Sequence, residues 1–238
     1  MAEATVGTNV DPVEVAQFER LANTWWDPDG PFWPLHGLNA LRTAYLRQAI
    51  CEHFGRDAEA PQPLDGVKVV DIGCGGGLLS ESFARLGATV RGIDVVEKNL
   101  HIAQGHARDT GLDVEYRHTT STACVEQGET YDVVLNMEVV EHVPDPASLI
   151  RECAQLCKPG GFVCIATINR TVKSWVFAKS ALNTYFACYR KARTSGASSS
   201  PHWKLRPNWS TTGVSWLKNA ACGLTHSRDV SPWHPRCR

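Results

Sequence analysis

An apolar segment that runs directly into a loop of glycines is the feature that most constrains the fold of this chain. Residues 67–72 (VKVVDI) have the character of a buried strand, and four of the next five residues (GCGGG) are glycine. Glycine reaches left-handed backbone angles and has no side chain, so such a loop lets a ligand approach the main chain. A helix predicted over 78–86 would present its free N–H groups there. The pattern predicts a binding crevice, although a purely structural turn would use the same residues.

The glycine spacing narrows the choice of ligand. A dinucleotide-binding loop carries G-x-G-x-x-G, and its third glycine would fall at Leu78. An NAD-dependent oxidoreductase is therefore the disfavoured alternative. Asp71 stands two residues before Gly73, and with Gly75 this D-x-G-x-G-G-G pattern resembles the first motif of class I S-adenosylmethionine-dependent methyltransferases. The resemblance implies that Asp71 helps to hold the loop and the amino-acid end of the cofactor.

Further strands and helices alternate along the chain. Asp94 ends a predicted strand, where a carboxylate suits hydrogen bonds to two ribose hydroxyls; a helix N-cap is the alternative interpretation. The alternation predicts an α/β, Rossmann-like class I methyltransferase fold, with a mostly parallel, twisted sheet and helices on both faces. Ligands bind beyond the carboxyl ends of such strands, where Met137 also lies. The other predicted strands are 89–93, 112–118, 131–137 and 162–167, and the helix between the first two of these is 98–110.

Composition excludes some classes of protein. The chain has 238 residues and a net charge of −1, so its bulk charge identifies no partner. Its acidic body and the absence of an N-P-P-[YF] motif argue against nucleic-acid binding. No apolar run approaches the roughly 20 residues of a membrane span, and the N-terminus has neither a signal-peptide nor a transit-peptide pattern. Nine scattered cysteines without C-x-x-C predict reduced thiols in the cytoplasm or a similar compartment.

The first 66 residues are predicted to form a helical lid and substrate-side segment. Asp11 suits the N-cap of a first helix, with Pro12 at its first position and Glu14 three residues after the cap. An aromatic loop follows, whose adjacent tryptophans serve either core packing or a lid over the substrate. A second helix is predicted over 39–54. Arg42 falls in its first turn, as a solvated charge or as a group that reaches a carboxylate.

A polar cluster follows the predicted strand 131–137. Glu138, Glu141 and His142 have the spacing i, i+3 and i+4, which would place them on one face of a helical turn. Two carboxylates and an imidazole suit a divalent cation, and oxygen ligands favour magnesium or manganese. Alternatively, His142 acts as a general base for a phenol or hydroxyl. If the three residues have no chemical role, they serve in helix capping and surface salt bridges.

Together these segments resemble one family, the ubiquinone-biosynthesis O-methyltransferases. The resemblance implies methyl transfer from S-adenosylmethionine to polyprenylated phenol or catechol intermediates. By matched positions it implies cofactor contacts from Arg42, Gly73, Asp94 and Met137. It also implies magnesium ligands at Glu138, Glu141 and His142, of which Glu141 and His142 are the expected catalytic residues. The matching segments are 18–42 (FERLANTWWDPDGPFWPLHGLNALR), 69–81 (VVDIGCGGGLLSE), 92–100 (GIDVVEKNL), 131–146 (YDVVLNMEVVEHVPDP) and 156–175 (LCKPGGFVCIATINRTVKSW).

The resemblance stops near Ala178, after a predicted cofactor-binding core over 67–172. Only one of the 25 acidic residues, Asp229, lies beyond residue 178, against ten of the 24 basic residues. This change predicts an atypical tail over 194–238, with the last sheet strands missing or altered. A shifted reading frame, a divergent C-terminus and a splice variant are the three explanations. A catalytically impaired, membrane-associated protein with this fold is the corresponding alternative function.

Residues 173–193 (KSWVFAKSALNTYFACYRKAR) combine aromatic and apolar residues with five bases and no acid. This composition is typical of a helix on an anionic membrane surface, and an ordinary packing helix is the alternative. The expected partners are therefore the lipid-tailed substrate, the membrane surface and other ubiquinone-biosynthesis proteins. The expected location is cytoplasmic, with peripheral contact to the inner membrane, on the matrix side in a eukaryote.

Overall fold

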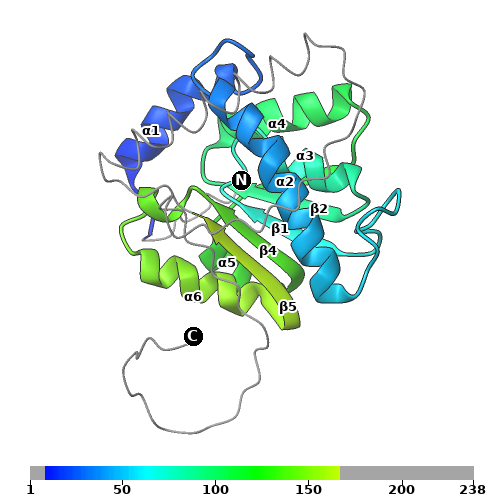
Figure 1. Ribbon diagram of the computed structural model, residues 1–238. Coiled ribbons are helices and arrows are strands. Elements are labelled where there is room, and N and C mark those ends of the chain that lie inside the picture. Colours follow the sequence, from blue (N-terminus) through cyan, green and yellow to red (C-terminus); the bar gives the residue numbers. More distant parts are fainter. Residues whose placement is uncertain (1–8, 167–238) are drawn as a thin grey trace, which may run out of the picture.

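The computed structural model describes residues 9–166 of the 238-residue chain. Within this range, helices pack on both faces of a parallel sheet of five strands, ordered β3-β2-β1-β4-β5 (Figure 1). The parallel α/β architecture predicted from the alternating pattern is confirmed. The elements are α1 (Pro12–Leu21), η1 (Ala22–Thr24), α2 (Trp33–Phe54), β1 (Lys68–Ile72), α3 (Leu78–Arg85), β2 (Thr89–Asp94), α4 (Glu97–Asp109), β3 (Val114–His118), α5 (Ser121–Glu126), β4 (Tyr131–Met137), η2 (Val140–His142), α6 (Pro146–Leu156) and β5 (Cys157–Ala166).

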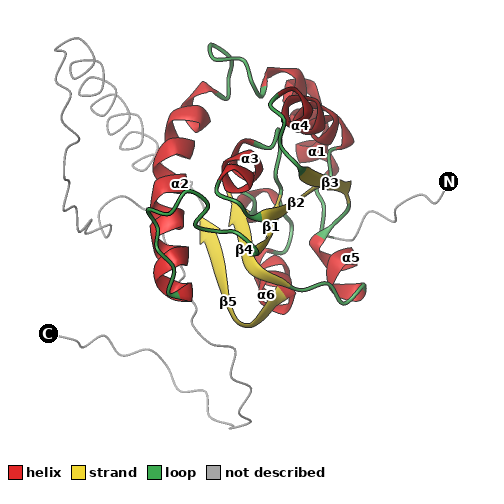
Figure 2. Cartoon of the chain, turned by 90° about the vertical axis from the view of Figure 1, so that its right-hand side faces the viewer, coloured by secondary structure: helices red, strands yellow, loops and turns green. Residues whose placement is uncertain are grey.

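Two apolar cores lie on opposite faces of the sheet. Side chains alternate between the faces along a strand, so Val69 of β1 packs against α2 and α3 whereas Val70 packs on the side of α5 and α6. Figure 2 shows α2 and α6 on the two sides of β4 and β5. This arrangement buries the middle of the sheet and leaves the carboxyl ends of β1, β2 and β4 to carry loops.

Three predicted boundaries differ from the structure by two residues or more. Helix α2 begins at Trp33 and not at Asn39, because Pro34 presets a helical backbone angle in the first turn. Strand β5 begins at Cys157 and not at residue 162; its ladder with β4 contains a register shift between Tyr131 and Val133, which accommodates the extra residues. Strand β3 begins at Val114 rather than at residue 112.

The N-terminal segment packs on the carboxyl-end rim of the sheet. The predicted cap is confirmed, since the Asp11 carboxylate accepts a hydrogen bond from the Val13 N–H. A third, smaller apolar cluster then joins the segment to the first residue of α3. The predicted segments 173–193 and 194–238, the altered last strands and the predicted strand end at residue 167 lie outside the described residues.

Candidate functional site

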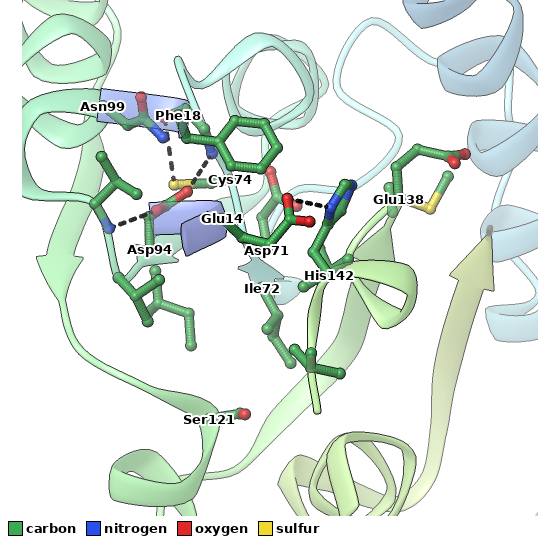
Figure 3. Close-up of a pocket in the computed structure, with 18 of the residues that line it drawn as sticks. Glu14, Phe18, Asp71, Ile72, Cys74, Asp94, Asn99, Ser121, Glu138 and His142 are labelled. Carbon is green, nitrogen blue, oxygen red and sulfur yellow. Dashed lines mark hydrogen bonds and ion pairs between the residues drawn. The ribbon is translucent and has the colours of Figure 1, made fainter. Parts of the chain in front are cut away.

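A pocket of about 310 Å³ opens at the carboxyl ends of β1, β2 and β4. Residues from the range 9–35 form one wall, and the loops after β1, β2, β3 and β4 form the others, together with side chains of α2, α3 and α6. Figure 3 shows side chains from these separate elements converging on one space. The predicted residues that line it are Arg42, Asp71, Gly73, Gly75, Asp94, Met137, Glu138, Glu141 and His142.

The glycine loop after β1 requires its glycines. Gly73 and Gly75 have φ angles of 70° and 54°, in the left-handed region that side chains disfavour. A Cβ at Gly75 would also collide with the indole of Trp25. The N–H groups of Gly73 and Cys74 donate to the carbonyl of Ile93, at 2.8 and 3.1 Å, which fixes the loop against the end of β2.

Asp94 braces the glycine loop from the end of β2. One carboxylate oxygen accepts from the Gly75 N–H at 2.8 Å, and the other accepts from the Val96 N–H at 2.7 Å. Burial raises the pKa of this carboxyl, and these hydrogen bonds oppose the rise. The alternative role as a helix N-cap is wrong, because the N-cap of α4 is Val96. Asp94 is thus a buried acceptor that lines the pocket.

Asp71 and Arg42 form the charged floor of the site. Asp71 is 3% exposed and accepts a hydrogen bond from the Ser80 hydroxyl at 2.6 Å. Burial raises the pKa of Asp71 to about 6, while the hydrogen bond from Ser80 and the charge of Arg42 oppose this rise. Burial lowers the pKa of Arg42, and Asp71 and Glu138 act in the opposite direction.

The shorter predicted helix places Arg42 in its first turn. This placement is wrong, since α2 begins nine residues before Arg42, at Trp33. The Arg42 Nε donates to the Asn39 side chain at 2.9 Å. The guanidinium thereby keeps a defined position beside the pocket. It is a fixed cation for an anionic group of a ligand.

The predicted helical turn after β4 is wrong. Glu138 has a φ of 60°, the one left-handed residue other than glycine in the described range, and only Val140–His142 form a 3-10 helix. Glu138 therefore does not share a helical face with Glu141 and His142, and Figure 3 shows it directed away from Glu14. Between residues 9 and 166, no group of three or more His, Cys, Asp or Glu side chains is arranged to hold a metal ion.

His142 instead pairs with an acid from the first helix. Its Nδ1 lies 2.9 Å from Glu14 Oε2, and the ring of Phe18 meets the imidazole edge-on at 5.2 Å between centroids. Both side chains are about one third exposed and line the pocket. In the sequence, Glu14 is recognisable only as a residue near a helix cap, since nothing local connects it with residue 142.

The two adjacent tryptophans hold the N-terminal segment on the glycine loop. Trp25 stacks on Phe32 with 3.9 Å between ring centroids and lines the pocket. Trp26 donates from its Nε1 to the carbonyl of Gly76 at 2.9 Å and stacks on His106 at 3.4 Å. Packing, one of the two alternatives from the sequence, is therefore confirmed, and the lid over the substrate stays a prediction.

Comparisons with known proteins show which family the chain resembles. A family model described as a methyltransferase domain matches residues 70–165. The chain is 52% identical over 174 residues to the ubiquinone biosynthesis O-methyltransferase of Sinorhizobium fredii, covering 73% of this chain and 70% of that protein. It is 49% identical over 177 residues to the protein of the same name from Parvibaculum lavamentivorans, covering 74% and 70%.

Among solved structures, the chain is similar to the magnesium protoporphyrin IX methyltransferase of Synechocystis PCC 6803 with bound SAM. The TM-score is 0.53 at 21% identity, over 69% of this chain and 80% of that one. At this identity the likeness supports the fold alone.

Proposed function

The chain belongs to the ubiquinone biosynthesis O-methyltransferases, and we propose that the pocket described above is where it transfers the methyl group. S-adenosylmethionine, when bound, supplies an electrophilic methyl group, which passes to an oxygen of the acceptor. Membership of this family sets aside the oxidoreductase alternative. The proposed acceptor is a polyprenylated phenol or catechol intermediate.

The glycine loop and Asp94 support the cofactor assignment. Gly73 and Gly75 line the pocket without a side chain of their own, while Val139 and Trp25 fill the space where a Cβ would lie. The Asp94 carboxylate is buried beside them. A buried carboxylate at the end of the second strand accepts hydrogen bonds from the two hydroxyls of a ribose. The single observation that carries the proposal is this 2.8 Å contact between Asp94 and Gly75, which joins the ribose acceptor to the glycine loop.

Arg42 and Asp71 then suit the amino-acid end of the cofactor. The Arg42 guanidinium suits the carboxylate of the cofactor. The Asp71 carboxylate suits the ammonium group of the cofactor, on the other side of the glycine loop. Met137, at the end of β4, lines the same pocket. We assign these residues to binding and orientation, which place the methyl carbon against the acceptor oxygen.

The acceptor oxygen must lose its proton during transfer. A phenol has a pKa near 10, so a base beside the oxygen accelerates the reaction. His142 is suited to this role, because Nε2 can accept the phenolic proton in the tautomer whose Nδ1–H donates to Glu14. Glu141, the other expected catalytic residue, lines the same wall.

Magnesium held by Glu138, Glu141 and His142 is the alternative means of forming the phenolate. These side chains are not brought together as ligands in the described range, so the proposed mechanism proceeds through His142 without a metal. Methyl-transfer assays with added magnesium and with a chelator distinguish the two. Rates that are equal in both conditions support His142 as the base, and a rate abolished by the chelator contradicts it.

We propose that each segment of the chain has the role predicted from the sequence. Residues 1–66 cover the substrate side, 67–172 bind the cofactor, and 173–193 contact the membrane that holds the acceptor. No helix between residues 9 and 166 is both long and apolar enough to cross a membrane. Sedimentation with anionic vesicles tests the proposed peripheral location at the cytoplasmic or matrix face of the inner membrane.

The first experiment is a calorimetric titration of the full chain with S-adenosylhomocysteine, followed by a methyl-transfer assay with a short-chain prenyl catechol. Binding followed by turnover is the expected result. Binding without turnover would favour the catalytically impaired alternative. A folded protein that does not bind S-adenosylhomocysteine would contradict the proposed site.

A further inference from the structure

A buried carboxylate at the pocket has no role in the mechanism above. Glu152, on α6, lines the pocket although only 8% of it is exposed. The Ser121 hydroxyl donates to Glu152 Oε2 at 2.5 Å. The hydroxyls of Thr122 and Ser148 donate to Oε1 at 3.1 and 3.2 Å. Within residues 9–166, Glu152 forms no salt bridge.

The hydrogen bonds of Glu152 leave acceptor capacity at Oε2. A carboxylate offers about four lone-pair directions, and the three hydroxyls occupy three of them. Thr122 and Ser148 both bond to Oε1, which is enough to hold α5 against α6. Oε2 accepts only from Ser121. Because a buried carboxylate is costly unless its acceptors are satisfied, a further donor at Oε2 would be favourable.

The position of Ser121 relates this carboxylate to the ribose acceptor. Asp94 is the register partner of His118, and the Thr119 N–H donates to the Asp94 carbonyl at 3.3 Å. The loop that leaves β3 therefore runs along the pocket from Asp94 to Ser121. Figure 3 shows Ser121 at the end of the pocket opposite Phe18. If a ribose is bound at Asp94 and its nucleobase points away from the glycine loop, the nucleobase would lie beside Ser121.

The surroundings of this end suit a flat heteroaromatic ring. Val95, Val143 and Leu149 line the same pocket with apolar side chains, and the last two belong to one apolar cluster with Cys124 of α5. Glu152 adds an acceptor oxygen, Oε2, whose one hydrogen bond comes from Ser121. We infer that Glu152, oriented by Ser121, accepts the hydrogen bond of the exocyclic amine of adenine and makes the site specific for a 6-aminopurine. This inference rests on the proposed function and adds to it a residue that selects the base.

The test compares two ligands on the full chain by calorimetry. One is S-adenosylhomocysteine, and the other is its 6-deamino analogue, in which purine replaces adenine. A hydrogen bond to a charged group is worth a factor of roughly 10 to 100 in affinity, so the analogue is expected to bind the wild-type protein more weakly by that factor. Equal affinities would overturn the inference while leaving the proposed function intact.

A variant then assigns the effect to Glu152. Glu152→Gln replaces the charge by a neutral acceptor of the same size, so the ratio between the two affinities is expected to narrow by about threefold or more. Glu126→Gln, an exposed position on the neighbouring α5, is the matched control and should preserve the ratio. An unchanged ratio in a folded Glu152→Gln protein would overturn the inference.

Ser121→Ala provides a second variant, which keeps the carboxylate but removes the hydroxyl that orients Oε2. It is expected to narrow the ratio as well, and it decides the matter if Glu152→Gln does not fold. Failure of folded wild-type protein to bind either ligand would overturn the proposed function together with this inference.

Discussion

The imidazole of His142 and the carboxylate of Glu14 lie 2.9 Å apart, although 128 residues separate them in the sequence. The contact joins the loop after β4 to the first turn of α1, so the candidate base depends on the N-terminal helix for its orientation. A carboxylate also stabilises the imidazolium that forms when His142 accepts a proton.

Glu14→Gln should therefore slow methyl transfer and leave cofactor binding intact. A charge-assisted hydrogen bond contributes about 1.5–3 kcal/mol, which corresponds to a loss of roughly tenfold or more in rate. Single-turnover transfer to a short-chain prenyl catechol measures the rate, and calorimetry with S-adenosylhomocysteine measures binding. Glu19→Gln, an exposed residue on the same helix, is the control. An unchanged rate in Glu14→Gln would remove Glu14 from the mechanism.

Two glycine substitutions with opposite expected effects test the cofactor loop. Gly75→Ala places a methyl group against Trp25 at a φ of 54°, and strain of this kind costs about 1–3 kcal/mol. It should lower both the unfolding free energy and the affinity for S-adenosylhomocysteine. Gly105→Ala lies within α4, where a Cβ meets no atom within 4 Å, and should stabilise the fold by about 0.5–1 kcal/mol. Urea denaturation and calorimetry of both variants provide the comparison.

The parts of the fold that could be predicted are those with local signals. The start of α1 follows from Asp11 and Pro12, and β1, β2 and β4 follow from short apolar runs bounded by glycine or a charged residue. Parallel strands end at the same rim, so the convergence of Gly73 and Asp94 on one pocket could be predicted as well.

The remaining features depend on contacts distant in sequence. The spacing of Glu138 from Glu141 fits a helix, but Glu138 adopts a left-handed angle while its N–H donates to the Ala166 carbonyl of β5 at 2.8 Å. This hydrogen bond continues the ladder between β4 and β5, so Glu138 does not begin a helix. Contacts of this kind, like those of His142 with Glu14, require the whole sheet, which periodicity does not describe.

The buried carboxyl of Asp71 should make stability depend on pH. Burial raises its pKa from 3.8 to about 6, so the folded state favours the protonated form. The stabilisation is then fully present below pH 3.8 and is lost as pH rises through about 6. At 1.36 kcal/mol per pKa unit, the total is on the order of 3 kcal/mol.

Urea denaturation of wild-type protein and Asp71→Asn across pH 4 to 7 measures this loss. The wild-type protein should lose stability relative to the variant as pH rises, since Asn cannot ionise. The unfolding free energy of Asp113→Asn, a variant at an exposed position, should depend on pH in the same way as that of the wild type. A constant difference between the wild type and Asp71→Asn over this range would show that the Asp71 carboxyl does not titrate there.

Trp26 should stabilise the glycine loop through its N–H group more than through its ring. The indole donates to the Gly76 carbonyl at 2.9 Å and stacks on His106, whose Nδ1 lies 2.6 Å from Glu81. Trp26→Phe keeps an aromatic ring over His106 but leaves the carbonyl without its donor, which costs about 1–3 kcal/mol for a buried group. Calorimetry should show weaker binding of S-adenosylhomocysteine, because the loop that contacts the ligand is less firmly held. His106→Ala removes the stacking partner and retains the donor, so a larger loss of affinity in this variant would assign the effect to stacking instead.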